Sequence, residues 1–565
     1  MLRSPIPSPR GGGDPRDLVT EFTYNGFGEV VSESSPDRGS IAYAHDRRGL
    51  VISRTDGRGV SVGYSYDNGG RLTGIDHPPG GIGDISFTWD QPYIGAPPDA
   101  NKGHIGEIDD GTVILRFNHA VLSTGPRVQT RAIYPAGRIY ATREHSDFEG
   151  NVFRTIYPSG RDIRANYDDD GRLLRLRLLD GGTWTTLVSA ITYAPNGPMV
   201  SALYGDGFTQ TRTYDLSYRL TGITDANGGT VLRQLGYAHD QRDNLGGITD
   251  VLAPLNSESF TYTAREHLMS ATGPYGALAF AYDGVGNRLT YTASGVSDSY
   301  SYPPASNRLS GITLGAGGAR SFGYDGAGNV VSEDRNGTLH SYSYDAAGRL
   351  STLSIGGSLV ASYRYDAMGR QVIRTLPGGT IHSVFDSQGR RIAEYDEASG
   401  ALIREYVWMD WDPVAVIEGG VVYYVRADHI GRPAFATDAT GAVVWSASYL
   451  PFGEVRVSTG PLPPMRFPGQ WFQSESGLHQ NWMRDYDPTM GRYLQADPLG
   501  LVDGATVYGY ARQNPGRWVD PRGEQVQALA PLVCVGPQAV ACAAIATCVG
   551  IAGALLHKSC EGFIS

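Results

Sequence analysis

Cysteine is missing from most of the chain: Cys534, Cys542, Cys548 and Cys560 all lie in the last 32 of the 565 residues. The preceding 533 residues therefore have no disulfide framework. Charged residues make up only 19% of the chain, which excludes a disordered polyelectrolyte. The net charge of −11 disfavours nucleic-acid binding by the main body, because an acidic surface repels phosphate groups.

The opening stretch, MLRSPIPSPRGGGDPRDLVT, lacks the apolar core of a signal peptide. We expect residues 1–20 to form an irregular leader, and the chain to stay cytoplasmic until a dedicated machine secretes or delivers it. The alternative is that the chain is a fragment of a longer protein. The twelve histidines show no HExxH spacing, and no glycine cluster is followed by the Lys-Ser/Thr of a phosphate loop. We therefore expect no metal site and no cofactor.

Glycine and tyrosine are abundant instead, at 75 and 34 residues. Together with the supply of Thr, Val and Asp, this composition favours strands joined by tight turns. A chain of this length could hold several ordinary domains, although a repeat architecture does not follow that rule.

A short motif recurs along the chain. It reads YDGVGNRL at Tyr282, YDGAGNVV at Tyr324, YDAAGRLS at Tyr344, YDAMGRQV at Tyr365 and FDSQGRRI at Phe385. The last four copies begin 20, 21 and 20 residues apart, and a decayed copy fills the gap after Tyr282. Weaker copies begin upstream, at Tyr24, Tyr66, Tyr167 and Tyr214.

Each position of the motif has a physical reason. The residues before Tyr-Asp alternate in polarity, as in HSYSYDAAG, which predicts a strand. The Asp can accept backbone N–H groups just ahead of it, and the Gly supplies the positive φ of a tight hairpin. One unit thus makes a hairpin whose apolar face is covered only if neighbours form a continuous sheet. Ordinary hairpins of a β-propeller are the alternative, but its blades need about 40 residues each.

These copies resemble the YD repeats of bacterial Rhs proteins, TcC toxin components and animal teneurins. The segment YVWMDWDP…RADHIGRP…YLPFGEV resembles the Rhs lead-in. The segments FPGQWFQSESGLHQNWMRDYDPTMGRYLQADPLGL and YGYARQNPGRWVDPRG resemble the Rhs-associated core. The resemblance covers about residues 20–523.

The resemblance implies an all-β fold: a spirally wound antiparallel β-shell closed at one end by the core. We assign residues 21–400 to the repeats, 401–523 to the core with its two DPxG tetrads, and 524–565 to a variable tail. We expect the tail to be short, helical and apolar. The shell itself is partial or complete.

The resemblance also implies self-cleavage by an aspartyl-protease-like centre, whose matching catalytic residues are Arg484, Asp485 and Asp497. Two carboxyls held close together cannot both ionise cheaply, so one can donate a proton while the other activates water. Arg484 could hold one of these carboxylates in place. Asp487 is a rival for the second carboxyl.

The cleavage region contains Asp520, Gly523 and Glu524. Asp520 belongs to the turn of the second tetrad, and the cut is predicted at or shortly after Gly523. Glu524 stands where the tightest Rhs subgroup has Leu, and the tetrads are 19 residues apart where that subgroup has 18, so the bond itself stays open. Asp before Pro is also a common turn residue, so plain Asx-type turns are the alternative reading.

Two further features are interpreted as structural. His429, in RADHIGRP, has no recognisable nucleophile as a partner. The aromatic run Tyr406, Trp408 and Trp411 is more typical of a packed core than of a sugar site.

Residues 538–556, QAVACAAIATCVGIAGALL, carry no charge and could just span a bilayer. Their small side chains make insertion marginal, so burial inside the shell is the alternative. The 42 residues from 524 to 565 are few for an enzyme, which predicts a short, truncated or absent cargo.

Three functions follow. The first is a container that encapsulates and releases its own C-terminal segment, with secretion or delivery proteins and an immunity protein as partners. The second is an unprocessed cell-surface YD-repeat protein that binds other cells or carbohydrate. The third is an orphan fragment left by recombination. At most, the sequence predicts single-turnover autoproteolysis as enzymatic activity.

Overall fold

The computed structural model describes residues 18–79, 83–91, 101–121, 127–195, 197–461 and 463–528. One antiparallel sheet of 40 strands runs from β1 (Glu21–Tyr24) to β40 (Val455–Thr459). The helical elements of the described residues are two short 3-10 turns, η1 (Pro254–Asn256) and η2 (Ala511–Gln513). The all-β prediction is therefore confirmed. The predicted helical tail lies outside the described residues.

The repeat unit is a hairpin, as its alternating pattern predicts. β29 (Thr338–Tyr344) pairs with β30 (Leu350–Ile355), which pairs with β31 (Ser358–Tyr365). Between β29 and β30, Gly348 adopts φ +84°, the left-handed conformation expected of the motif glycine. In three copies without this glycine, a side-chain-bearing residue takes the same conformation: Tyr218, Asp243 and Glu266.

The motif aspartate organises the turn. Asp345 Oδ1 accepts the backbone N–H of Arg349 at 3.0 Å, and Asp345 Oδ2 accepts Nε of the same arginine at 2.8 Å. The aspartate thus satisfies turn N–H groups that would otherwise need water. The Arg that opens the returning strand is also its ion-pair partner. The same pair recurs at Asp67–Arg71, Asp168–Arg172, Asp215–Arg219, Asp366–Arg370, Asp386–Arg390 and Asp428–Arg432.

The motif tyrosine joins neighbouring units, a role that its sequence pattern does not reveal. The Tyr344 hydroxyl donates to the carbonyl of Val330, the first residue of β28 (Val330–Arg335), at 2.6 Å. Where a copy has tryptophan instead, the indole N–H makes the equivalent bond, as Trp89 does to Leu72. Equivalent tyrosine bonds recur at Tyr66, Tyr167, Tyr193, Tyr214, Tyr262, Tyr302, Tyr365 and Tyr449.

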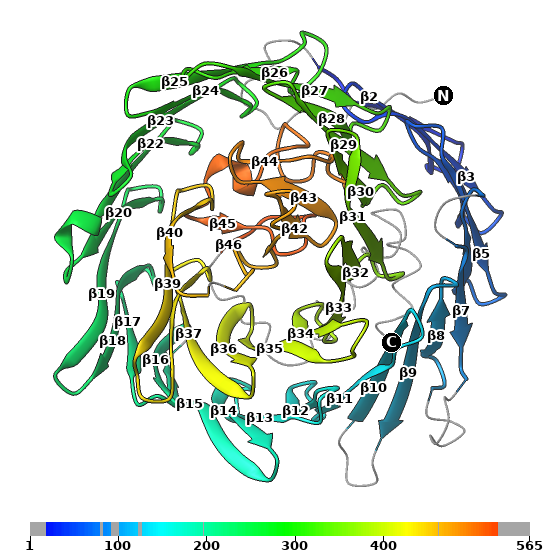
Figure 1. Cartoon of the computed structure of the whole chain (residues 1–565). Helices are drawn as coiled ribbons and strands as arrows, with labels where there is room; N and C mark the ends of the chain where they lie inside the picture. The colour runs from blue at the N-terminus through cyan, green and yellow to red at the C-terminus, as the bar shows by residue number, and fades with distance from the viewer. Residues whose placement is uncertain are drawn as a thin grey trace.

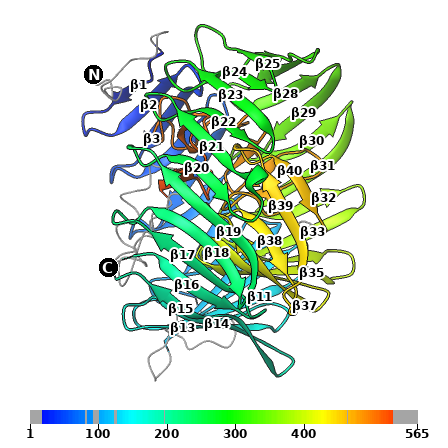
Figure 2. The same cartoon turned by 90° about the vertical axis from the view of Figure 1, so that its left-hand side faces the viewer.

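The sheet forms a spiral wall of two windings (Figure 1). We call β1–β25 (Glu21–Ser301) the first winding and β26–β40 (Gly311–Thr459) the second winding. Figure 2 shows β1–β3 on the left and β28–β33 on the right, so the windings are displaced along the spiral axis.

Hydrogen bonds and ion pairs join the two windings. Arg58 donates to the carbonyls of Asp345 and Ala346 at 2.8 and 2.9 Å. Farther along, Arg426 binds both carboxylate oxygens of Asp206 at 2.9 and 2.8 Å, and both side chains are fully buried. Because such pairs satisfy buried charge across the contact, they hold the windings in register.

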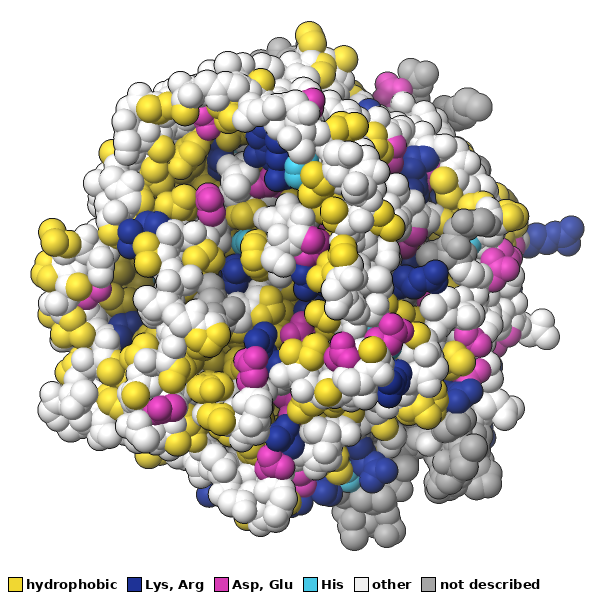
Figure 3. Space-filling model, viewed as in Figure 1, with side chains coloured by type: hydrophobic (Ala, Val, Ile, Leu, Met, Phe, Trp, Pro, Cys, Tyr) yellow, Lys and Arg dark blue, Asp and Glu magenta, His cyan; other side chains and the backbone are white. Residues whose placement is uncertain are grey.

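The two faces of the wall differ in chemistry. One face is exposed and carries cross-strand hydroxyl pairs such as Thr261–Ser270 and Thr292–Ser297, both at 2.6 Å. The other face buries apolar side chains such as Ile312, Leu350 and Tyr363. In Figure 3, hydrophobic side chains gather in the recesses between the outer wall and the centre. The alternation therefore sends one set of side chains to water and the other inward.

The centre of the spiral is filled by residues 463–528, which we call the plug (Figure 1). The plug has a four-stranded sheet and a two-stranded one. Their strands are β41 (Trp471–Phe472), β42 (His479–Asn481), β43 (Arg484–Asp487), β44 (Arg492–Tyr493), β45 (Trp518–Val519) and β46 (Gln527–Ala528). The wall sheet continues past residue 401 to Thr459, so the predicted lead-in is part of the wall.

Candidate functional site

β43 presents its residues to opposite sides. It pairs with β42 and β44, and all four of its residues are buried. Successive side chains of a strand point to opposite faces, so Arg484 and Asp485 meet different surroundings.

Arg484 gathers most of the predicted site. Its Nη2 lies 2.8 Å from Asp497 Oδ2 and 3.0 Å from Asp520 Oδ2. Its Nε donates to the carbonyl oxygen of Gly523 at 2.6 Å. The guanidinium lies 3.7 Å from the centre of the Tyr493 ring. One arginine therefore bridges two carboxylates and the peptide bond that follows Gly523.

Asp520 fixes the turn of the second tetrad. Its Oδ1 accepts the backbone N–H groups of Glu524 and Gln525 at 3.0 and 3.2 Å. Its Oδ2 accepts the Tyr493 hydroxyl at 2.8 Å. With Arg484, four donors hold this carboxylate. The chain after Gly523 is thereby held beside Arg484.

Gly523 occupies a place that only glycine fits. Its φ is +65°, and a β-carbon there would lie 2.4 Å from the carbonyl oxygen of Asn481. Replacing it would therefore move the peptide bond away from Arg484.

Two carboxyls of the cluster have their pKa raised to near 7. Burial raises the pKa of Asp497 to about 7 although Arg484 lowers it, and the Asp520 charge adds to the rise. Burial likewise raises the pKa of Glu524 to about 7, with Arg522 opposing and the Asp520 and Asp497 charges contributing. A carboxyl with such a pKa can either donate or accept a proton near pH 7.

Asp485 lies apart from this cluster, with Gln495. Gln495 Nε2 donates to Asp485 Oδ2 at 2.6 Å, and the Asp485 N–H donates to Gln495 Oε1 at 2.8 Å. Among the described residues, Asp485 Oδ1 is buried without a hydrogen-bond partner. Burial raises the pKa of Asp485 to about 7. The interactions of the described residues include none between the carboxyls of Asp485 and Asp497, so the role of Asp485 stays a prediction.

Asp487, the predicted rival, is part of a structural contact. Arg320 Nη2 binds it at 2.8 Å, and the backbone N–H of Thr489 donates to it at 2.8 Å. Burial would raise the pKa of Asp487, but Arg320 and Arg335 outweigh it and lower this pKa to about 2. The carboxylate therefore stays charged and anchors the plug to β27 (Ala319–Tyr324).

Two further residues contact this site but are not predicted from the sequence. Asp503 Oδ2 accepts the backbone N–H of Val526 at 2.8 Å, just beyond the predicted cut. Arg38, in the turn between β2 (Val30–Ser35) and β3 (Gly39–His45), donates to the carbonyl of Pro498 at 3.2 Å. Asp503 gives no signal beyond its place six residues after Asp497. Arg38 is 460 residues from its partner, and no local pattern reports such a contact.

Of the side chains interpreted as structural, Trp411 lines a space between the wall and the plug, and the other three pack as expected. His429 is half-buried, its ring centre lies 5.3 Å from that of Tyr237, and desolvation lowers its pKa to about 4. Tyr406 is fully buried against Trp471, with ring centres 4.9 Å apart. Trp408 packs on the same cluster. Within the described residues, no group of three His, Cys, Asp or Glu side chains is placed to hold a metal ion.

Comparison with known proteins places the chain in a family. The sequence model described as Teneurin YD-shell matches residues 187–514, and that described as RHS Repeat matches residues 45–81. The toxin subunit YenC2 of Yersinia entomophaga is 25% identical over 472 residues, covering 69% of this chain and 48% of YenC2. The double-stranded DNA deaminase toxin A of Burkholderia cenocepacia is 40% identical over 108 residues, covering 18% of this chain and 8% of that toxin. The chain thus spans less than a tenth of that toxin and about half of YenC2.

Solved structures show the same fold. The crystal structure of TcdB2-TccC3 superposes with a TM-score of 0.74 at 19% identity, covering 89% of this chain and 29% of the other. The Photorhabdus luminescens Tc holotoxin pore gives a TM-score of 0.75 at 18% identity, covering 91% and 28%. At such identities the likeness shows the fold alone. Because the Teneurin YD-shell model covers more than half of the residues, as the repeats and core motifs predict, the chain belongs to the teneurin YD-shell family.

Proposed function

We propose that this protein is an encapsulating β-shell that holds its own C-terminal polypeptide and releases it by cutting itself once, between Gly523 and Glu524. The observation that carries the proposal is the hydrogen bond that Arg484 Nε donates to the Gly523 carbonyl oxygen. The same guanidinium also binds Asp497. A donor at this oxygen can stabilise the charge that develops there during attack by water.

The proposed chemistry needs one ionised and one protonated carboxyl. Ionised Asp497 takes a proton from water, whose oxygen bonds to the Gly523 carbonyl carbon. A protonated carboxyl gives its proton to the Glu524 nitrogen as the C–N bond breaks. The products are a carboxyl group on Gly523 and an amine on Glu524. The family resemblance names Asp485 as the second carboxyl of the centre. Glu524 is the alternative for the acid, because the pKa of Glu524 responds to the charge of Asp497 whereas Asp485 is paired with Gln495.

The relatives suggest the setting of this release. Their names include a toxin subunit of Yersinia entomophaga and a DNA deaminase toxin of Burkholderia cenocepacia. By analogy, residues 524–565 are the candidate cargo, and delivery proteins and an immunity protein are the proposed partners. The chain would stay cytoplasmic until delivery. No helix of the described residues is long and apolar enough to cross a membrane, and the predicted segment 538–556 lies outside them.

N-terminal sequencing tests this proposal against the unprocessed binding protein. Purified chain should yield a C-terminal fragment that begins at Glu524, co-elutes with the shell in native buffer and separates from it in denaturant. A fragment that begins elsewhere would move the site. An intact chain that binds cells or carbohydrate would favour the adhesion alternative.

A further inference from the structure

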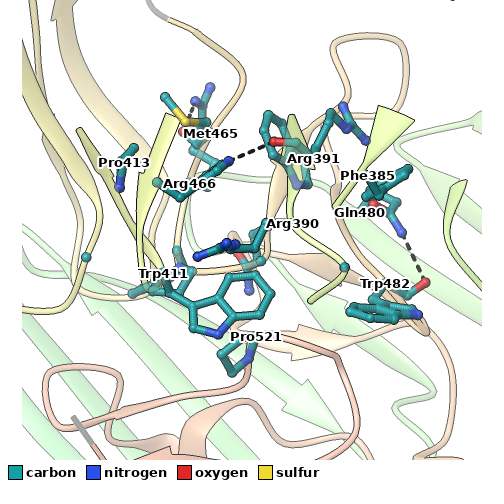
Figure 4. A pocket seen from close by; sticks show the side chains of 18 of the residues that line it. Phe385, Arg390, Arg391, Trp411, Pro413, Met465, Arg466, Gln480, Trp482 and Pro521 are labelled. Carbon is teal, nitrogen blue, oxygen red and sulfur yellow. Dashed lines mark hydrogen bonds between the residues drawn. The ribbon is translucent and has the colours of Figure 1, made fainter. Parts of the chain in front are cut away.

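A second site lies between the wall and the plug, beside the turn of the second tetrad. Its cavity volume is about 20 Å³. Figure 4 shows side chains from the wall, including Arg390 and Trp411, and from the plug, including Pro521, around this space. Its lining contains no carboxylate but four arginines, three glutamines and four tryptophans: Arg370, Arg390, Arg391, Arg466, Gln371, Gln470, Gln480, Trp408, Trp411, Trp471 and Trp482.

Three of these arginines are neutralised by carboxylates behind the lining. Arg370 binds Asp366 and Arg390 binds Asp386, both at 2.7 Å. The third, Arg391, binds Glu394 at 2.8 Å. These three charges are balanced within the wall.

Arg466 is different. It is only 6% exposed, and its Nη1 donates to the carbonyls of Pro463 and Met465 at 3.0 and 2.8 Å. None of the ion pairs formed by the described residues includes it. Burial lowers the pKa of Arg466, and no carboxylate opposes that effect. The guanidinium also lies 4.6 Å from the centre of the Phe472 ring, but no carboxylate of the described residues pairs with it. A buried charge without a counter-charge is rare, because its hydration is not fully replaced.

Several N–H groups of the described residues around the same space, one of them on Arg466, have no acceptor. In the described part of the chain, four buried nitrogens lack an acceptor: Arg391 Nε, Arg466 Nε, Gln371 Nε2 and Gln470 Nε2. Folded proteins leave few such N–H groups unsatisfied. Four of them around a lining without acids indicate a ligand that brings acceptor atoms and negative charge.

We propose that this space binds one small carboxylate ligand. A carboxylate matches the planar fork of a guanidinium, and one negative charge balances the single uncompensated arginine. The indoles suit the apolar part of such a molecule. A phosphate dianion would bring one charge too many. The site does not depend on self-cleavage.

The test titrates the full-length protein with acetate, replacing chloride at constant ionic strength. Tryptophan fluorescence reports directly, because four of the eight tryptophans line the space. We expect saturation with a midpoint on the order of 1 mM, well within what four non-hydrogen atoms allow. Phosphate at equal ionic strength should bind at least about tenfold more weakly. A linear response, or one equal for phosphate, would overturn the proposal.

Two variants and a control test whether acetate binds in this space. Arg466→Gln should weaken acetate binding at least about tenfold, the loss expected for a charge-assisted hydrogen bond. Gln470→Glu supplies a carboxylate from the lining itself, so it should abolish the acetate response in a folded protein. It keeps the proposal testable if Arg466→Gln does not fold. Arg512→Gln, an exposed plug arginine 4.9 Å from the Trp518 ring, should leave the midpoint unchanged. An unchanged midpoint in Arg466→Gln or Gln470→Glu would refute the assignment.

Discussion

At the scale of single residues, Arg484 acts through its shape as well as its charge. Lysine would keep the charge but could not contact Asp497 and the Gly523 carbonyl in the same geometry. We expect Arg484→Lys to slow self-cleavage by about 100-fold or more, the usual cost of losing a donor to a developing oxyanion. A time course of fragment formation by gel would measure it.

Arg517→Lys is the matched control, since Arg517 binds Glu266 at the edge of the plug. Its rate should equal that of the wild type. Equal rates for both variants would remove Arg484 from the mechanism.

The raised pKa of Asp485 predicts that the stability of the folded protein depends on pH. Its folded pKa of about 7 lies above the ordinary 3.8, so the folded state binds a proton more tightly than the unfolded chain. Stability should therefore fall as pH rises from about 4 to about 7, by up to roughly 4 kcal/mol. Asp485→Asn, which cannot ionise, should be more stable than the wild type at pH 8 and nearly equal at pH 4.

Denaturant unfolding at the two pH values measures the difference. Asp345→Asn is the comparison, because Asp345 keeps a salt bridge with Arg349. Losing this salt bridge should destabilise the protein at pH 8. If Asp485→Asn were destabilising at pH 8, the buried carboxyl would not be the source of the pH dependence.

At the scale of elements, the twenty-residue hairpin is the unit that the sequence predicts best. The alternation before Tyr344, the Asp345 turn and the positive φ of Gly348 all follow from local chemistry. The tyrosine bond to the neighbouring strand does not, because its partner Val330 lies in the preceding unit. Local sequence chemistry therefore determines the hairpin, but it does not determine which residues of the neighbouring hairpin its side chains contact.

Replacing a motif glycine should therefore carry a defined cost. Gly348→Ala places a side chain at φ +84°, and we expect a loss of about 1–2 kcal/mol in unfolding free energy. Gly229→Ala is the control, since Gly229 has open space and no left-handed φ. Chemical denaturation of both variants would decide it. An equal loss would show that backbone conformation is not what the motif glycine supplies.

At the candidate site, too, the sequence motif predicts which residues are involved but not all of their contacts. Arg484 contacts Asp497, Asp520 and the Gly523 carbonyl, and Glu524 lies close enough for its pKa to respond to these charges. The motif could not show that Asp485 faces Gln495, because neighbouring strand residues diverge and their partners depend on packing.

At the scale of the whole molecule, the turn between β2 and β3 of the wall contacts the plug. Arg38 binds Glu33 at 3.1 Å and the carbonyl of Pro498 at 3.2 Å, next to Asp497. We expect Arg38→Ala to slow self-cleavage by about tenfold, because one lost hydrogen bond of this kind allows the first tetrad to shift. The rate of fragment formation, with circular dichroism to confirm the fold, checks this.

Arg48→Ala is the control. Arg48 lies in the next turn of the wall, where it binds Asp46 at 2.8 Å and donates to the carbonyl of Asp67. It should cleave at the wild-type rate. A normal rate in Arg38→Ala would mean that the first winding does not position the tetrad.

The intact mass of the purified protein tests the central claim most directly. The wild type should give two species, one ending at Gly523 and one comprising the 42 residues from Glu524 to Ser565. Asp497→Asn should give a single species near 60.7 kDa. A wild type that stays at full length, or an Asp497→Asn chain cut at the same bond, would contradict the proposed self-cutting plug.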